Sequence, residues 1–454
     1  MKKYIVIFIC FFSVTYAQHS YIKTDYKISK EENVFIDSLQ YRAFLYFVNE
    51  INPANGLVKD RSNENSPASI AATGYALPVW AVGAEHKWIS KDSALDLSIN
   101  LLNFFLNSEQ SLSPDATGYH GLYYHFLDMK EGKRHWKSEL STIDTGLLFA
   151  GIIFCKNYYN GNSAKEKKLR TLCHKIMERV NWNFMTMPDS GKYANTINLG
   201  WDPESGFTDV GWVGYNEALI MYVIASGTNF TGYKKAYDKW LSFYEWRKTY
   251  NNIEMLSFPP LFGHQYSHIY IDFRNIKDNY MKKKGIDYFE NSRRATHVQR
   301  LYAISNPMQW VGYDSLTWGL SACDGPGEKF NYDNKKFDYY NARGVSGPDL
   351  IQNDDGTIAP TASVSSICFA PEIVIPSIYN MFKKYSAKGL WGKYGFVDAF
   401  NPTVNWYDKE YLGIDQAPIV LMIENFRTGF IWKQMMKDPI IKKGLKNLEF
   451  TKAQ

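Results

Sequence analysis

Apolar side chains recur at three- and four-residue spacing over much of the chain, which is the spacing of an α-helix. Loops rich in Gly, Asp, Asn and aromatic residues separate these segments. The pattern predicts ten helices, at residues 32–51, 69–85, 91–106, 141–159, 164–180, 215–225, 233–243, 291–304, 367–383 and 416–435.

The predicted helices are of two kinds. Residues 147–154 and 218–225 are apolar on every side, which is typical of buried helices, whereas 164–180 is amphipathic. Alternation of the two kinds indicates two concentric layers, so we expect an all-α fold of the (α/α)6 barrel type. Loops of this length are usually functional, and we expect a site at one end of the barrel, built by residues 110–140, 185–215, 255–290, 305–365 and 395–415.

The N-terminus has the pattern of a cleavable signal peptide. Lys2 and Lys3 precede an apolar run at 4–14, and Ala17 offers a small residue for cleavage. The run is too short to span a membrane, and no later stretch is apolar for 18 residues. We therefore expect a signal peptide at 1–17, a single domain at 18–454 with its core at about 33–437, no stable membrane insertion, and a periplasmic or secreted location.

Composition narrows the function classes. Aromatic residues make up 16% of the chain, and many lie beside Gly, Asp, Asn or His. Such surroundings suit the stacking of sugar rings, although aromatic filling of a large core explains the same numbers. The net charge is +5 without a long basic stripe, which argues against nucleic-acid binding.

The cysteines do not indicate a metal centre. Beyond Cys10, the chain has Cys155, Cys173, Cys323 and Cys368, and none forms a CxxC pair. We expect no zinc site, and we interpret these residues as small buried side chains, with a disulfide left open.

Hydrolysis of a glycosidic bond normally needs two carboxyl groups, one of them protonated near neutral pH. Glu217 stands out because it lies among apolar and aromatic residues at 211–220, at the start of a predicted buried helix. Such surroundings suit a general acid. The alternative is a glutamate in the first helical turn, stabilised there by the helix dipole.

Candidates for the second carboxyl have competing structural interpretations. Ser141 and Asp144 match a helix-capping pattern, and Glu139 lies just outside that helix. Asp415 precedes the helix predicted at 416–435, where it is either an N-cap or a base, and Asp408 is a further candidate.

Other polar and aromatic clusters resemble a sugar-binding surface, with Trp212, Tyr215, His264, Gln265, His268, Arg293, Asp324, Asp355 and Trp406 as its candidates. A helix would put His264 and His268 on one face, but no zinc signature is complete. Residues 354–357 lack the spacing of a calcium loop. No nucleophile elbow or nucleotide-binding motif is present in a convincing context, so we expect no metal and no cofactor.

Several motifs together resemble the bacterial glucoamylase-like domain family, which includes the endo-β-1,2-glucanases of glycoside hydrolase family 144. The resemblance covers about residues 33–437 and rests on NGLV at 55–58, SIAATG at 69–74, SELSTIDT at 138–145, LFGHQYSH at 261–268, GIDYFENSRRAT at 285–296, CDGP at 323–326, DGTIAPT at 355–361 and GIDQ at 413–416.

This resemblance implies an (α/α)6 barrel and the hydrolysis of β-1,2-glucan with inversion. It also implies that Glu217 is the proton donor, and that a distant aspartate acts as base through water or a substrate hydroxyl. Asp415 matches best, and Asp144 is next.

The chain also departs from the family. Ala417 stands where glycine is common in relatives, and residues 77–80 differ from the usual pattern. These departures leave open whether the chain cuts within glucans or releases a disaccharide. Another glycosidase, a lyase or an epimerase on the same barrel, and a non-catalytic glycan-binding protein, are the alternatives.

Overall fold

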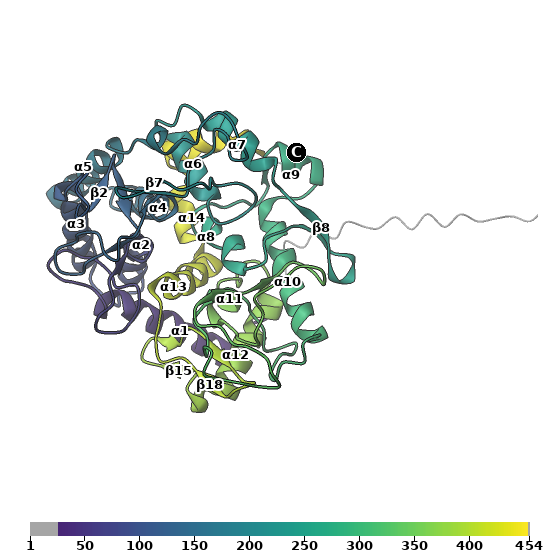
Figure 1. The fold of residues 1–454 in the computed structure, drawn as a ribbon. Helices are drawn as coiled ribbons and strands as arrows, with labels where there is room; N and C mark the ends of the chain where they lie inside the picture. The colour runs from purple at the N-terminus through teal and green to yellow at the C-terminus, as the bar shows by residue number, and fades with distance from the viewer. Residues whose placement is uncertain (1–25, 453–454) are drawn as a thin grey trace, which may run out of the picture.

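The computed structural model describes residues 26–452 and is mostly helical (Figure 1). Its α-helices are α1 (Lys30–Asn49), α2 (Ile70–Glu85), α3 (Lys91–Asn107), α4 (Thr142–Tyr158), α5 (Ala164–Glu178), α6 (Leu219–Gly227), α7 (Tyr233–Leu241), α8 (Tyr266–Tyr270), α9 (Asn279–Lys284), α10 (Tyr288–Ser305), α11 (Pro360–Val364), α12 (Pro371–Tyr385), α13 (Gly413–Thr428), α14 (Phe430–Met435) and α15 (Pro439–Asn447).

All ten predicted helices are confirmed as helical segments, but two differ in ways that affect the site. The helix predicted at 215–225 begins only at Leu219 in α6, which leaves Glu217 ahead of it. The helix predicted at 416–435 is two helices, because Gly429 adopts a left-handed conformation (φ 64°) between α13 and α14. The pattern missed α8, α9, α11 and α15, of which the first three are too short to show a clear period.

Serine residues mark where several helices begin. The side chains of Ser69 and Ser141 each accept a backbone N–H at the start of α2 and α4. Ser29 with Glu32, at the start of α1, forms a full capping box. Each of these side chains satisfies a backbone donor that has no partner within the helix, and so defines the end of the helix.

The apolar helices form an inner layer. Helix α2 packs against α4 and α13, α4 also packs against α6, and α13 against α8 and α11. Helices α1, α3, α5 and α12 pack outside them, and the colours in Figure 1 run around the molecule in that order. Helices α2 and α4 approach closely because Gly74 faces Leu148: a Cβ on Gly74 would lie 2.5 Å from the Leu148 Cα. This contact sets the spacing of two elements that carry site residues.

Short antiparallel strands join the helices, so the expectation of an all-α fold is corrected to a mostly helical one. The largest sheet has the order β2–β3–β5–β6–β7, formed by Gly118–Tyr119, Leu122–Tyr124, Leu140–Ser141, Gly200–Asp202 and Gly206–Phe207. The remaining strands pair two by two: β1 (Ala68–Ser69) with β4 (Phe126–Leu127), β8 (Trp246–Lys248) with β9 (Glu254–Leu256), β10 (Ile276–Lys277) with β19 (Thr451–Lys452), β11 (Ala322–Cys323) with β12 (Asn341–Ala342), β13 (Gly344–Val345) with β14 (Ile351–Gln352), β15 (Trp391–Gly392) with β16 (Gly395–Phe396), and β17 (Phe400–Asn401) with β18 (Trp406–Tyr407).

Some predictions concern the chain ends and the cysteines. The signal peptide predicted at 1–17 lies outside the described residues. Across residues 26–452, we find no helix with the length and apolarity needed to cross a membrane. Cys155, Cys173, Cys323 and Cys368 are free thiols, and the first three are buried, as expected for small core side chains.

Candidate active site

Glu217 lies in a turn just ahead of α6, and α8 holds this turn in place. The hydroxyl of Ser267 donates to the Glu217 carbonyl oxygen (2.8 Å) and accepts from the Ile220 amide (2.9 Å). The Oε2 atom of Glu217 is buried and finds no hydrogen-bond partner among residues 26–452. Burial raises the pKa of Glu217 to about 7, a backbone N–H opposes this shift, and the nearby charge of Asp144 adds to it. This carboxyl therefore holds a proton near neutral pH.

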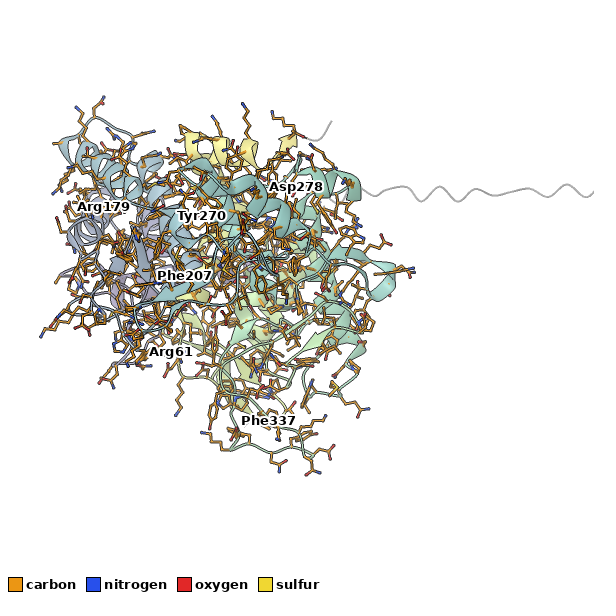
Figure 2. The ribbon with its side chains drawn as sticks, turned by 45° about the horizontal axis from the view of Figure 1, so that its top comes forward. Arg61, Arg179, Phe207, Tyr270, Asp278 and Phe337 are labelled. Atoms are coloured by element: carbon orange, nitrogen blue, oxygen red, sulfur yellow. The ribbon has the colours of Figure 1, made fainter. Side chains whose placement is uncertain are left out.

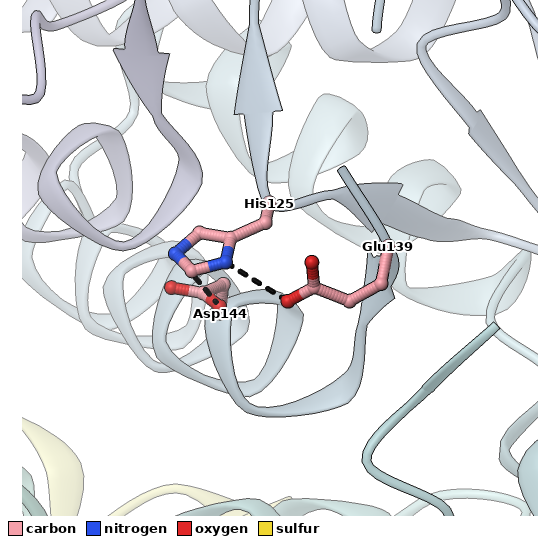
Figure 3. Close-up of side chains that lie close together, drawn as sticks. All are labelled: His125, Glu139 and Asp144. Atoms are coloured by element: carbon pink, nitrogen blue, oxygen red, sulfur yellow. Dashed lines mark hydrogen bonds and ion pairs between the residues drawn. The ribbon is translucent and has the colours of Figure 1, made fainter. Parts of the chain in front are cut away.

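His125 lies between two carboxyl groups (Figure 3). Its Nδ1 is 2.9 Å from Glu139 Oε1, and its Nε2 is 3.7 Å from Asp144 Oδ2. Burial opposes protonation of His125, but Asp144 and Glu139 outweigh it and raise the pKa of the imidazole to about 9. The ring is therefore a cation at neutral pH. We call these three residues the histidine group.

The strands and helix explain how the histidine group forms. His125 directly follows β3, Glu139 directly precedes β5, and the two strands pair in the large sheet. Asp144 is in the first turn of α4, where the Ser141 side chain caps its amide and also donates to its Oδ2. The predicted capping interaction is thus confirmed, and it fixes the orientation of the Asp144 carboxyl.

A second set of carboxyl groups surrounds Asp415. The chain enters α13 at Gly413, so Asp415 lies in the first turn and Leu412 is the N-cap residue, which corrects the predicted N-cap role of Asp415. Glycine is needed at 413 because a Cβ there would lie 2.7 Å from the Ala72 Cβ of α2. Asp415 is 3% exposed, and burial, with further contributions from Asp324 and Asp60, raises its pKa to about 7.

The neighbours of Asp415 are also acidic. Burial raises the pKa of Asp398 well above its usual range, and the charges of Asp415 and Asp324 add to the shift. For Asp408, burial together with the charges of Asp398 and Asp324 raises the pKa to about 8. We call Asp324, Asp398 and Asp408 the aspartate group.

Arg61, labelled in Figure 2, is the cation in contact with this region. Its Nη1 lies 2.9 Å from Asp324 Oδ2 and 3.2 Å from Glu410 Oε2, and its Nε lies 3.5 Å from Asp60 Oδ2. Residues far apart in the sequence therefore meet at one guanidinium.

Tyr75 of α2 connects the two sides of the site. Its ring is buried and stacks on Tyr270 (5.9 Å between centroids; Tyr270 is labelled in Figure 2), and its hydroxyl finds no hydrogen-bond partner among the described residues. Burial raises the pKa of the Tyr75 hydroxyl well above its usual range, and Asp144, Asp415 and Glu217 all contribute to the shift. The charges of the three predicted catalytic carboxyls thus all act on one buried hydroxyl.

The polar side chains of the 264–268 segment are buried and bonded within the protein, and their predicted sugar-binding role stays a prediction. His264 Nε2 contacts the Phe258 carbonyl (3.0 Å), and Gln265 Nε2 donates to the Ala362 carbonyl (2.7 Å). His268 is 1% exposed, and Ser292 Oγ lies 3.0 Å from its Nε2. Burial lowers the pKa of His264 to about 4, so this ring is neutral.

Three further candidates are also internal. Arg343 holds Asp355 through two bonds of 2.8 and 2.7 Å. Arg293 donates to the Phe369 carbonyl (2.6 Å) and to Glu372 (2.5 Å). Tyr215 is buried and stacks on Tyr288. These contacts lie within the core, and the predicted sugar-binding role of the three side chains stays a prediction.

The partly exposed candidates remain available to a substrate. Trp212 Nε1 donates to Thr142 Oγ1 (2.9 Å), which places this indole beside the start of α4. Trp406 lies in β18, two residues before Asp408, and both are partly exposed. Glu139 and Asp324 also belong to this set, because their side chains are 39% and 16% exposed.

Sequence reasoning did not select His125, Asp398 or Tyr75 as site residues. Asp398 carried a usable signal, since it is a lone carboxylate in the apolar run GFVDAF at 395–400. His125 stands in an aromatic stretch and Tyr75 in a buried helix, and neither pattern indicates a charged or polar contact.

Comparison with known proteins gives related chains along nearly the whole length. A family model described as "putative glucoamylase" matches residues 209–439. A curated relative from Parabacteroides distasonis, named exo beta-1,2-glucooligosaccharide sophorohydrolase (non-reducing end), is 25% identical over 94% of this chain. The chain spans 59% of the length of that relative.

Solved structures with the same fold include two that cover 94% of this chain and 99% of their own. One is a "putative glucoamylase" from Bacteroides uniformis, with 30% identity and a TM-score of 0.80. The other is an endo-beta-1,2-glucanase from Chitinophaga pinensis in complex with sophorotriose and glucose, with 26% identity and a TM-score of 0.80. Because the family model matches just over half of the chain, and the Bacteroides uniformis relative is 30% identical across nearly all of it, this chain belongs to the glucoamylase-like family.

Proposed function

We propose that this chain is an inverting glycoside hydrolase that cleaves β-1,2-glucan. The observation that carries the proposal is Glu217, a buried carboxyl whose Oε2 finds no hydrogen-bond partner among the described residues and whose pKa burial raises to about 7. The names of the relatives from Parabacteroides distasonis and Chitinophaga pinensis support the substrate.

In this mechanism, Glu217 gives its proton to the leaving glycosidic oxygen as the bond from that oxygen to the anomeric carbon breaks. A water oxygen attacks the anomeric carbon from the opposite face, which inverts its configuration. The proton of that water passes to Asp415, directly or through a substrate hydroxyl. Asp144 is the second candidate for this base, but its bonds to Ser141 and His125 hold it in the histidine group.

The two carboxyls set a narrow pH range for turnover. Glu217 must be protonated and Asp415 ionised, and burial raises the pKa of each to about 7. Activity should therefore fall on both sides of neutral pH, as expected for an acid and a base acting together.

The scaffold and setting are part of the same proposal. We infer that α2, α4, α6, α8, α11 and α13 are the inner helices of an (α/α)6 barrel, with the other long helices outside, in one domain at 18–454. A periplasmic or secreted location stays a prediction from the sequence. Release of sophorose and cleavage within the chain are both compatible with the proposal.

The test is a panel of glucans incubated with the protein, followed by separation of the products. Linear β-1,2-glucan should be cut and starch should not, and proton NMR of the first products should show the α-anomer. Cleavage of starch alone would contradict the substrate, and ultraviolet-absorbing unsaturated products would indicate a lyase. Glu109→Gln, at an exposed loop position, is the control for Glu217→Gln and should keep full activity.

A further inference from the structure

The aspartate group brings together three segments of the chain. Asp324 directly follows β11, Asp398 precedes β17, and Asp408 directly follows β18. One carboxylate oxygen from each residue lies within 4.8 Å of the other two. Three like charges at such spacing repel one another unless protons or a cation intervene.

Backbone amides orient two of these carboxylates. The Asp324 amide donates to Asp398 Oδ2 (2.8 Å), and the Lys409 amide donates to Asp408 Oδ1 (2.6 Å). With every carboxyl ionised, Asp398 Oδ1 and Asp408 Oδ2 are buried and find no hydrogen-bond partner among the described residues, whereas a proton shared by Asp398 and Asp415 would bond that pair. Asp398 is only 2% exposed. A buried acceptor without a partner is costly, and its presence points to a ligand.

The guanidinium of Arg61 does not neutralise the aspartate group. Arg61 contacts Asp324, Asp60 and Glu410, so its single charge is shared among three carboxylates. None of the ion pairs among the described residues reaches Asp398 or Asp408, whereas the histidine group has its own cation in His125. When its carboxyls are ionised, the aspartate group therefore carries an excess of negative charge at its centre.

We propose that Asp324, Asp398 and Asp408 bind a hard divalent cation, with Ca²⁺ as the preferred ion. Carboxylate oxygens are the ligands that Ca²⁺ favours, and its flexible coordination accepts three protein ligands with water in the remaining positions. The ion would connect the segment after β11 to the two segments that flank the β17–β18 hairpin. We infer this ion without using glycoside hydrolysis, so the outcome of the calcium experiment does not depend on the proposed function.

The experiment follows thermal unfolding of the full chain at pH 7.5 after dialysis against a chelator. Adding CaCl₂ at about a hundredfold above its dissociation constant should raise Tm by about 2 to 5 °C, because the ion binds only the folded state. Isothermal titration should give one ion per chain. Mg²⁺ and Mn²⁺ serve as comparison ions.

Asp398→Asn and Asp408→Asn should each abolish the calcium-dependent rise, since each replaces one of the three charged ligands with a neutral amide. Glu410→Gln is the matched control: it removes a carboxylate near Arg61 but no ligand, and the rise should persist. Circular dichroism and a cooperative melt verify that each variant is folded.

Two results would overturn the proposal. One is a Tm that none of the three ions changes, which would mean that the carboxyls share protons instead. The other is a calcium-dependent rise that survives in both Asp398→Asn and Asp408→Asn, which would place the ion elsewhere.

Discussion

The two acidic groups of the site bury carboxylates in opposite ways. In the histidine group, the His125 ring lies between Glu139 and Asp144, so a protein cation compensates the charges (Figure 3). In the aspartate group, Arg61 contacts Asp324 but neither Asp398 nor Asp408, and two buried oxygens find no hydrogen-bond partner among the described residues. A buried charge without a partner carries the full free-energy cost of its desolvation. The histidine group should therefore stabilise the fold, and the aspartate group should destabilise it.

This contrast also bears on catalysis. None of the ion pairs among the described residues includes Glu217, and the negative charge of Asp144 helps to keep it protonated. Asp415 lies next to Asp398, on the side with excess charge. The proton donor and the proposed base thus belong to different electrostatic surroundings, and each prediction below tests one part of this difference.

The largest effect should come from Glu217→Gln, which removes the proton donor. We expect kcat on β-1,2-glucan to fall by about 10³-fold while substrate binding persists, as measured by initial rates and by titration with oligosaccharide. The same variant should be more stable than the natural chain at pH 8, by up to about 3 kcal/mol, because a neutral amide replaces a carboxyl that burial disfavours when ionised. Near-normal turnover would exclude Glu217 as the acid.

The next largest effect should come from Asp415→Asn, whose kcat and Tm are compared with those of Asp144→Asn. If the base lies on the aspartate side, Asp415→Asn should lower kcat by about 10²-fold and remove the acid limb of the pH profile, with little change in KM. Asp144→Asn should mainly lower Tm, because it leaves His125 with one partner. The reverse pattern of kcat and Tm would transfer the role of base to Asp144.

His125→Gln tests, by thermal unfolding, how much the cation of the histidine group stabilises the fold. The pKa of His125 is raised, so its stabilising contribution is fully present below about pH 6.5 and is lost as the pH rises through about 9. At pH 6 the variant should lose about 2 kcal/mol of unfolding free energy, a value reduced from the full shift because the ring is partly exposed. Above pH 9.5 the two proteins should converge. A loss that does not change with pH would indicate a packing effect only.

The smallest effect is expected for Asp398→Asn in the absence of divalent cations. Since the pKa of Asp398 and that of Asp408 are both raised, the natural chain should lose stability as the pH rises from about 4 through about 8. The variant should show a flatter slope and equal or slightly higher stability at pH 8, measured by urea unfolding across that range. A steeper slope in the variant would mean that Asp398 is compensated after all.

Sequence patterns were most reliable for the long helices and for Glu217. The apolar spacing in α2 and α4 reflects burial on every side, and Ser69 and Ser141 mark their starts through local bonds. Glu217 could be selected because its immediate neighbours are apolar, and those neighbours cause part of its burial. By contrast, His264 and His268 looked like binding residues, but only the packing of α10 and of the loop before α8 against them shows that they are internal.

What the sequence determined by itself is therefore local: helical periodicity, caps, and carboxyls within apolar runs. The tertiary structure alone decided which charges meet. His125 joins Asp144 through strand pairing, and Asp324 joins Asp398 and Asp408 across more than seventy residues of chain. Electrostatic interactions act through space and depend on burial. No fixed spacing of residues in the sequence therefore shows whether an acidic group has a cation beside it.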